Sequence, residues 1–418
     1  MKMDAHRDAA YNRAHRSGRR TALEVLNGIR VIDLTQALAG PYCAQLLGDF
    51  GAEVIKVERP AGGDQARGWG PPFVAGESSY FMGTNRNKRS ITLDLQIPRA
   101  REIMDCLVDR ADVLIHNVPR RATREKLGID AARVRGRNAR IIWASITGFG
   151  LTGPEAEKPG YDVIAQAMSG TMALTGEPDH GPTRFPTPMA DITTGIYTAL
   201  AIVAALYERQ SSGVGQELDL ALLDCQTTWL ANVASAYLAT GSAPAKRGNA
   251  HPNIAPYQPF HAADDWFIVA AGTEGHWKLL IETLGIDATI GSDRRFSSNA
   301  ERVAHREELD ALLSEQFARH PVDYWIGKLE AAGIPCGPIN RPEQILNHPH
   351  MAARNMIVST QHPSAGPVRS LGNPMKMSRT TPRAERPAPL LGEHTVAVLS
   401  ELGYDADQIE QLRRERAV

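Results

Sequence analysis

The sequence is poor in the features that mark several large classes of protein. Its 418 residues include four cysteines, at positions 43, 106, 225 and 336, and no pair has CxxC spacing. This usage is typical of a reducing compartment and favours neither a disulfide framework nor a zinc site. The longest strongly apolar run, 196–207, has 12 residues, whereas a membrane span needs about 20. We therefore expect a cytoplasmic protein, or one of the mitochondrial matrix in a eukaryote, without a membrane partner.

An excess of either charge is also lacking. The chain carries 46 Lys and Arg against 47 Asp and Glu, a formal net charge of −1. A protein that coats nucleic acid needs surplus cations to displace counterions from the phosphates. Nucleic acid is therefore not expected as a partner. The 43% hydrophobic composition is ordinary for a soluble globular protein.

Several cofactor and catalytic motifs are absent. No GxGxxG follows the first predicted strand, and there is no GxxxxGK[ST], HExxH or GxSxG. One GxGxxG match occurs at 148–153, but Pro154 and a polar stretch follow it, so we predict a loop there. His348 and His350 flank Pro349 without an adjacent acid, which also predicts a loop rather than a metal site. Nicotinamide, flavin and metal cofactors are therefore not expected.

What the sequence does contain is an alternation of strands and helices. Strands are predicted at 30–34, 53–57, 90–95, 113–116 and 141–146, with helices at 41–50 and 100–110. This alternation predicts parallel βαβ units, and hence an α/β fold with a doubly wound sheet. A long helix is predicted over 191–209, with Asp191 at its N-terminal end.

The composition also changes along the chain. Residues 1–24 are basic, lack the apolar centre of a secretory signal, and are predicted to form a disordered tail. Residues 25–225 are predicted to form the first part of a large domain. Aromatic and proline punctuation within 226–335 predicts a smaller α+β domain with linkers, and 336–418 are expected to return to the large domain.

Two segments are candidates for binding an anion. Residues 39–41 (AGP) lie at the turn from the first strand into a helix, where free backbone N–H groups hold polar or anionic groups; the alternative is a tight turn selected for packing. Arg86, Lys88 and Arg89 precede a strand, and we predict that Arg59, which ends the second strand, lies at the same sheet edge. These cations predict a phosphate site, with a solvated charged face as the alternative.

Eight segments spread along the chain form a recognisable series. In order they are GIRVIDLTQALAGPYCAQLLGDFGAEVIKVER, NRNKRSITLDL, ADVLIHNV, ASITGFGLTGP, PGYDVIAQAMSG, ADITTGIYTALAIVAALYERQSSGVGQELDLALLD, AAGIPCGPIN and LLGEHT. Together they resemble the family III CoA-transferases, a group that includes formyl-CoA transferase, carnitine CoA-transferase and the α-methylacyl-CoA racemases. The resemblance implies a Rossmann-like large domain formed by both chain ends, a smaller α+β domain, and a homodimer of interlocked rings.

The resemblance also implies the catalytic residues. The family's nucleophile is the Asp of an A/G-D-x-x-x-G segment that opens a long helix, and Asp191 in MADITTG holds that position. It would form aspartyl anhydride and aspartyl-CoA thioester intermediates; from the residues alone, the alternative is a plain helix cap. Tyr161 stands where racemase members carry His, a better proton shuttle at neutral pH. Asp162 matches a transferase Glu or Asp beside the anhydride, with a helix-start acid as the alternative.

Contacts with CoA are implied in the same way. The matching positions are Ala37, Leu38, Ala39, Arg59, Leu93 and Asn117. Gln96 stands where the family has a lysine, and VPRRATREK (118–126) replaces the usual turn after Asn117. The basic contact expected there is left open among Arg120, Arg121, Arg124 and Lys126. With Arg86, Lys88 and Arg89, these residues form the predicted cofactor-binding set, and acyl-CoA is the expected substrate.

We therefore expect an enzyme that transfers CoA from a short acyl-CoA, such as succinyl-CoA, to a small carboxylic acid, in particular a dicarboxylate. Arg67, Arg184 and Arg247 are candidates to hold a second carboxylate. Arg247 lies in RGNAHP, which replaces the glycine run of formyl-CoA transferase. Two alternatives remain: a racemase or isomerase of CoA esters, disfavoured by Tyr161, and a catalytically silent acyl-CoA-binding protein, disfavoured by Asp191.

Overall fold

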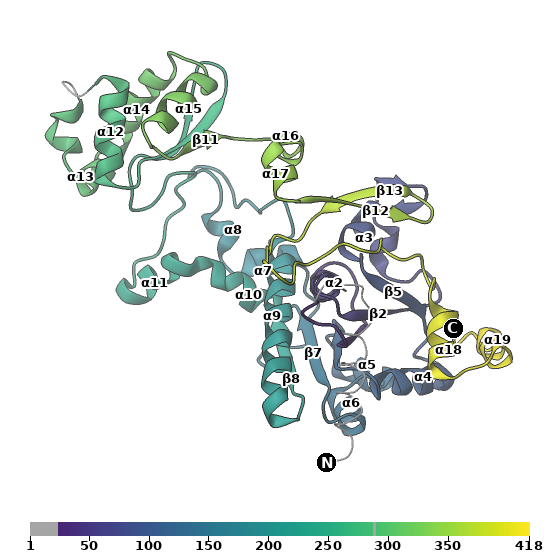
Figure 1. The fold of residues 1–418 in the computed structure, drawn as a ribbon. Coiled ribbons are helices and arrows are strands. Elements are labelled where there is room, and N and C mark those ends of the chain that lie inside the picture. The colour runs from purple at the N-terminus through teal and green to yellow at the C-terminus, as the bar shows by residue number, and fades with distance from the viewer. Residues whose placement is uncertain (1–23, 287–289) are drawn as a thin grey trace. The chain divides into compact units, whose positions relative to one another are not determined.

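The computed structural model describes residues 24–286 and 290–418. The predicted N-terminal tail, apart from its last residue, lies outside this described part. Contacts within the chain divide it into two compact units (Figure 1). The large unit comprises 24–160, Asp191–Leu222 and Asn355–Val418, so the chain returns to it near its C-terminus. The small unit comprises Tyr161–Ala190 and Leu223–Arg354.

The large unit is built on one sheet of six parallel strands in the order β5-β2-β1-β6-β7-β8 (Figure 1). Numbered along the chain, this is the 3-2-1-4-5-6 order of a doubly wound sheet. The strands are β1 (Arg30–Asp33), β2 (Glu53–Glu58), β5 (Lys88–Thr92), β6 (Val113–His116), β7 (Ile142–Thr147) and β8 (Glu217–Ala221). The first five confirm the prediction. The edge strand β8 was missed from the sequence.

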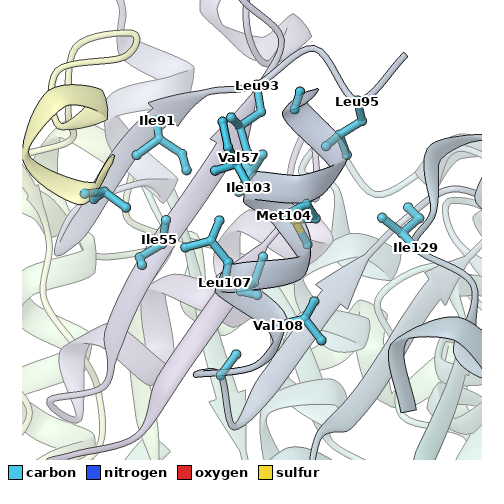
Figure 2. Packing of buried hydrophobic residues seen from close by; sticks show 14 of the residues in the cluster. Ile55, Val57, Ile91, Leu93, Leu95, Ile103, Met104, Leu107, Val108 and Ile129 are labelled. Atoms are coloured by element: carbon cyan, nitrogen blue, oxygen red, sulfur yellow. The ribbon is translucent and has the colours of Figure 1, made fainter. Parts of the chain in front are cut away.

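A continuous apolar core packs between this sheet and the helices α4 (Pro98–Val108), α18 (Thr395–Leu402) and α19 (Ala406–Arg414). Figure 2 shows Ile103 and Leu107 of α4 among the side chains of strands β2 and β5. Val398 and Ile409, from α18 and α19, belong to the same core. The C-terminal segment is therefore an integral part of the large unit.

The helix that follows β1, α2 (Ala39–Asp49), packs against the start of α9 (Met189–Ser212). A β-carbon built on Gly195 would lie 2.7 Å from the carbonyl oxygen of Ala39, so glycine is required for this close approach. At the other end of α9, Arg209 forms an ion pair with Asp112 at 2.8 Å. The beginning of α9 is therefore held beside the turn between β1 and α2.

One side of α9 is apolar and exposed. Ile196, Leu200, Val203 and Tyr207 follow one another at helical spacing with exposed fractions of 47%, 63%, 38% and 75%. We call these four residues the α9 stripe. By length and composition α9 meets the criterion for a membrane-crossing helix, but core helices of soluble proteins meet it as well, and 44% of its most apolar window is buried.

The remaining elements of the large unit are short. Two helices follow β6, and an antiparallel hairpin precedes the C-terminal helices. These elements are β3 (Phe73–Val74), β4 (Glu77–Ser78), α3 (Ser79–Thr84), α5 (Arg121–Leu127), α6 (Ala131–Arg137), β12 (Ile357–His362) and β13 (Gly366–Leu371).

The small unit combines helices with a three-stranded antiparallel sheet, β11-β10-β9. Its core is aromatic: the Phe317 ring contacts Phe260, Phe267 and Trp325 at centroid distances of 5.0–5.3 Å. The strands are β9 (Tyr257–His261), β10 (Trp266–Ala270) and β11 (Cys336–Pro338). The helices are α7 (Asp162–Met168), α8 (Thr171–Leu174), α10 (Leu222–Thr227, which starts in the large unit), α11 (Ala231–Thr240), α12 (Glu274–Leu284), α13 (Asn299–Ala304), α14 (Arg306–Phe317), α15 (Val322–Ala331), α16 (Pro342–Leu346) and α17 (Pro349–Ala353).

The prediction of a loop at His348–His350 is wrong, because α17 begins there. Pro349 occupies the first helical position, where its fixed φ and missing N–H are tolerated. The ring nitrogen Nδ1 of His348 accepts the N–H of His350 and caps the helix. The loop predicted at 148–153 is confirmed, since no helix or strand forms there.

His116, the last residue of β6, is a buried histidine in the middle of the sheet. Its side chain packs against Trp143 at a ring-centroid distance of 4.4 Å, and its Nδ1 accepts the N–H of Val118. Burial, and to a smaller extent the charge of Arg124, lowers the pKa of His116 to about 3. The folded protein therefore keeps this ring neutral over a pH range in which the unfolded chain protonates it.

We predict that His116 makes the protein less stable as the pH falls below about 6.5, because only the unfolded state then takes up the proton. The free energy of unfolding should fall by about 1.4 kcal/mol per pH unit from this source until the folded pKa is reached. In His116→Phe, which keeps a ring against Trp143, this contribution should disappear. Thermal unfolding of both proteins between pH 7.5 and 4.5 measures the difference in slope, and parallel profiles would contradict the assignment.

Candidate active site

The strand order places a crevice at the carboxyl edge of the sheet. From β1 the chain continues to β2 on one side of the sheet, and from β6 it continues to β7 on the other side. In open α/β sheets, ligands bind at the carboxyl ends of two adjacent strands whose connections diverge in this way. A cavity of about 110 Å³ lies at this edge, among the segments that follow β1, β2, β5 and β6. Its lining includes Gln36, Arg59, Leu93, Gln96 and Val118. Arg59, which is exposed, and Leu93, which is buried, thus line the same cavity.

The turn from β1 into α2 is held by side chains of neighbouring segments. Asn117, directly after β6, donates to the carbonyl oxygen of Gln36 at 2.9 Å and accepts its N–H at 3.2 Å. The Ala37 N–H donates to Asp64 Oδ1 at 3.0 Å. Leu38 and Ala39 then begin α2 without a side-chain cap. The predicted residues 37–39 and 117 therefore lie at one edge of the sheet, with Asn117 acting on Gln36.

Beneath this turn lies a buried cluster of two lysines and two aspartates. Lys88 Nζ lies 2.9 Å from Asp33 Oδ2, and Lys56 Nζ lies 2.9 Å from Asp64 Oδ2. The side chains of Lys56, Lys88 and Asp33 are 0% exposed. Lys56 also donates to the Thr35 carbonyl at 2.8 Å. We call Asp33, Lys56, Asp64 and Lys88 the buried ionic cluster.

The opposite charges of this cluster stabilise one another's ionised forms against the cost of burial. Burial opposes ionisation of Asp33, but Lys56 and Lys88 outweigh it and lower the pKa of Asp33 to about 2. Burial lowers the pKa of Lys88 to about 8, although Asp33 acts in the opposite direction. Removing one partner would leave a buried charge uncompensated, which is strongly destabilising.

The prediction that four cations share one edge of the sheet is wrong; they are Arg59, Arg86, Lys88 and Arg89. β2 and β5 are parallel, with Val54 opposite Lys88 and Glu58 opposite Thr92. Residues that precede a strand lie at the amino edge of a parallel sheet, whereas Arg59 follows β2 and lies at the carboxyl edge. Arg86 precedes β5, and Lys88 and Arg89 are its first two residues, so these cations and Arg59 lie at opposite edges.

The three cations around the start of β5 have partners inside the large unit. Arg86 binds both carboxylate oxygens of Asp49 and donates to the Leu371 carbonyl. Arg89 pairs with Glu53 and Glu401, each at 2.7 Å. Lys88, in the buried ionic cluster, also donates to the Pro41 carbonyl at 2.8 Å, so its charge supports α2 from below. These side chains act within the fold.

Among the four cations that follow Asn117, Arg124 has a structural role and the other three are exposed. Arg124 is buried, and its guanidinium donates to the carbonyls of Val118 and Pro119. Arg121 is exposed and pairs with Glu125 at 2.8 Å. Arg120 and Lys126 are exposed, at the start of α5 and within it.

The predicted catalytic residues lie at the starts of two helices. Asp191, half-buried, is in the first turn of α9, whose Gly195 lies against Ala39. Tyr161 is 59% exposed and precedes α7, and Asp162 is the first residue of α7. Asp162 Oδ1 accepts the N–H of Ala190 at 2.8 Å, and Ala190 immediately precedes Asp191. Asp162 therefore binds the backbone beside Asp191.

The three spare arginines differ in their surroundings. Arg67 binds both oxygens of Glu58, at 2.7 and 2.8 Å, and its guanidinium stacks on Phe81, so it has a structural role. Arg184 and Arg247 are exposed. Arg247 lines a cavity of about 330 Å³ in the small unit, together with Asn249, Gln258, His261 and other residues.

A larger cavity, of about 630 Å³, lies at the amino edge of the sheet, away from the residues above. It is lined by residues at or just before the starts of strands, such as Arg30, Glu53 and Asp112, and Glu53 pairs there with both Arg30 and Arg89. Its size alone does not make it the site, because the motif-bearing loops are at the carboxyl edge. In the described part of the chain no group of three His, Cys, Asp or Glu residues could hold a metal ion.

Two contributors to the site were missed from the sequence. Lys56 lies within an apolar strand, and Asp64 lies in the loop after it, six residues beyond Glu58. A lysine flanked by Ile55 and Val57 in a fully buried strand was the available signal, because a buried charge requires a partner.

Comparisons with known proteins decide the family. The family described as CoA-transferase family III matches residues 26–395. The chain belongs to this family. It is accordingly an enzyme of the CoA-transferase class, as the resemblance implied.

Individual relatives cover nearly the whole chain. A succinate–glutarate CoA-transferase of Agrobacterium fabrum is 45% identical over 383 residues, which are 90% of this chain and 95% of that protein. The succinyl-CoA:glutarate CoA-transferase of the mouse is 40% identical over 395 residues, 94% of this chain and 89% of that protein. The crystal structure of a CAIB/BAIF family protein from Brucella suis, 43% identical, matches with a TM-score of 0.82 over 91% of this chain and 99% of that one.

Proposed function

We propose that this CoA-transferase moves CoA from succinyl-CoA, or a similar short acyl-CoA, to a small dicarboxylate in the cytoplasm. The observation that carries the proposal is the likeness along almost the whole chain to enzymes named for succinate and glutarate. The geometry is compatible with it, since Asp191 lies in the first turn of a helix packed beside the β1–α2 turn, at the edge of the sheet where open α/β folds bind ligands.

Asp191 is the proposed nucleophile, and its reaction keeps the energy of the thioester. Its carboxylate attacks the donor acyl carbonyl and the C–S bond breaks. CoA departs as the thiolate, and Asp191 and the donor acyl group are joined as a mixed anhydride. The thiolate then attacks the Asp191 carbonyl carbon, which releases the donor acid and forms an aspartyl-CoA thioester. The acceptor carboxylate displaces the thiolate to form a second anhydride. Attack of the thiolate on the acceptor's acyl carbon gives the new acyl-CoA and frees Asp191.

Asp162 is proposed to position this nucleophile. Its Oδ2 accepts from Gln166 at 2.7 Å, while Oδ1 accepts the N–H of Ala190. A carboxylate held in this way fixes the Met189–Ala190 peptide, one peptide bond before the one that leads into Asp191. Tyr161, the exposed neighbour, is proposed to face the reacting acyl group and to leave the enzyme without the second base that racemisation requires.

CoA is proposed to lie along the carboxyl edge of the sheet. Residues 37–39 offer the start of α2, and Leu93 and Arg59 line the small cavity beside it. Lys126, an exposed cation of α5, is proposed to reach a phosphate, and Asn117 supports Gln36. Arg86, Lys88 and Arg89 are not included, because ion pairs at the amino edge or below α2 occupy them.

The covalent step predicts that Asp191 becomes modified by acyl-CoA in the absence of an acceptor. Hydroxylamine trapping followed by peptide mass spectrometry should find a hydroxamate at Asp191. In Asp191→Ala the adduct should be absent and kcat should fall at least about 10³-fold. Asp224→Ala, which removes another aspartate from the first turn of a helix, α10, is the matched control and should retain both. An unmodified Asp191 under turnover conditions would overturn the mechanism.

The acceptor preference predicts a specific loss in an arginine variant. Arg247→Gln should raise KM for succinate or glutarate about tenfold or more, because a charge-assisted hydrogen bond to the second carboxylate is lost. Activity with acetate, which lacks that carboxylate, should change less than about twofold. Arg319→Gln, an exposed arginine of the same unit, controls for net charge. Equal wild-type rates with acetate and glutarate would contradict the dicarboxylate assignment.

The enzyme is proposed to work as an interlocked homodimer. The α9 stripe leaves four large apolar side chains exposed on one helix of the isolated chain, and surfaces of this kind commonly mark protein interfaces. A second copy of the chain is the proposed cover, with the two chains threaded through each other as the family resemblance implies.

Interlocking predicts that subunits do not exchange without unfolding. The protein should have the mass of two chains in solution. A mixture of tagged and untagged protein should form no mixed dimer under native conditions, because linked rings must open to separate. Mixed dimers should appear after joint unfolding and refolding. A monomer mass, or exchange within hours in native buffer, would rule out this assembly.

A further inference from the structure

Ala37 has a backbone conformation that residues with a β-carbon seldom adopt. Its φ angle is +69°, in the left-handed region, where the chain leaves β1 and turns into α2. Glycine reaches this region freely, whereas the β-carbon of an L-residue is crowded there. Such residues persist where the surroundings hold them, and they cluster at functional sites.

Asp64 supplies the hydrogen bond at this position. Its Oδ1 accepts the Ala37 N–H at 3.0 Å and the Ala66 N–H at 2.9 Å, the second of which caps the short helix Gln65–Gly68. One carboxylate oxygen thus joins the β1–α2 turn to the loop that follows β2. Asn117 holds the preceding residue, Gln36, through both of its backbone polar groups.

Asp64 is itself held rigidly. The residue is 1% exposed, and its backbone N–H donates to Glu58 Oε2 at 3.0 Å. Its second carboxylate oxygen lies 2.9 Å from Lys56 Nζ, which also donates to the Thr35 carbonyl. Lys56 therefore binds both Asp64 and the residue two positions before Ala37. The acceptor and the turn share one buried cation and keep a fixed separation.

The conformation of Ala37 sets the direction in which the chain enters α2. Leu38 precedes α2 with no side-chain cap, so the first N–H groups of the helix receive no capping side chain from that residue. The Ala39 carbonyl lies against Gly195 in the first turns of α9, close in sequence to Asp191. A rotation at Ala37 would move both the start of α2 and its contact with α9.

We propose that Asp64 is a positioning residue that holds Ala37 in the left-handed conformation and thereby pre-forms the β1–α2 turn for CoA. The inference rests on the proposed function, in which this turn contacts CoA. Asp64 borders the small cavity but is only 1% exposed, and its Oδ1 binds the Ala37 N–H, so its proposed action is through Ala37. Without the Asp64 carboxylate, Ala37 leaves the left-handed conformation. CoA then has to restore this conformation when it binds, which lowers the affinity of the protein for CoA.

The inference predicts a coupling between positions 64 and 37. Asp64→Ala should raise KM for acyl-CoA and Kd for CoA about tenfold, the effect of returning a left-handed alanine to its preferred conformation. The value of kcat at saturating acyl-CoA should change less than about twofold. In an Ala37→Gly background, where the left-handed conformation is accessible, the same Asp64→Ala substitution should raise Kd only about two- to threefold.

The test uses the purified full-length protein and the four members of this cycle. CoA affinity is measured by titration calorimetry with CoA alone, which requires no turnover, and KM and kcat are measured in parallel. Asp293→Ala is the matched control, because Asp293 caps another short 3₁₀ helix, Arg294–Phe296, in the small unit. Ala37→Val retains Asp64 and disfavours the left-handed conformation, so it should weaken CoA binding even if Asp64→Ala does not fold.

The possible results are distinct. Relief of the Asp64→Ala defect by Ala37→Gly, with kcat preserved, supports the inference. An equal loss of CoA affinity in both backgrounds, or unchanged affinity in Ala37→Val, would overturn it and leave the proposed function intact. Failure of the wild-type protein to bind CoA would overturn the proposed function and the inference with it.

Discussion

The site depends on the buried ionic cluster beneath the β1–α2 turn. Two lysines, Lys56 and Lys88, lie between Asp33 and Asp64 without solvent access and donate to carbonyls on either side of the turn. Transferring these charges from water is costly, and only mutual pairing with additional hydrogen bonds compensates the cost. The arrangement has a discrete geometry because each lysine lies 2.9 Å from a carboxylate oxygen in a site closed to solvent, and the backbone of the turn shares that geometry.

This constraint links the strand order to the chemistry. The sheet brings the ends of β1, β2, β5 and β6 together at one edge, and the cluster fixes the backbone that emerges there. The close contact between Gly195 and Ala39 then places the start of α9 beside the same turn. A carboxylate in the first turn of a helix is favoured in its ionised form, as a nucleophile requires. The proposed catalytic aspartate and the proposed CoA-binding turn are therefore positioned by one framework.

Much of this could be predicted from the sequence, and the failures have physical causes. Buried parallel strands appear as apolar runs, so β1, β2, β6 and β7 were found, whereas the edge strand β8 alternates exposed acids with leucines and was missed. The run at 85–89 looks the same whether its cations are solvated or paired, and the partners of Arg86 and Arg89 come from positions 49 and 401. Asp64 and Lys56 acquire their roles only through contacts that the fold creates.

The central claim is that Asp191 exchanges an oxygen with the substrates at each turnover. In the proposed mechanism the bridging oxygen of the second anhydride comes from the acceptor and stays on Asp191 when CoA leaves with the acyl group. Turnover with succinyl-CoA and ¹⁸O-labelled glutarate should therefore introduce ¹⁸O into the Asp191 peptide, detected by mass spectrometry. Product formation with an unlabelled Asp191 would show that CoA passes between the acids by another route and would contradict the account.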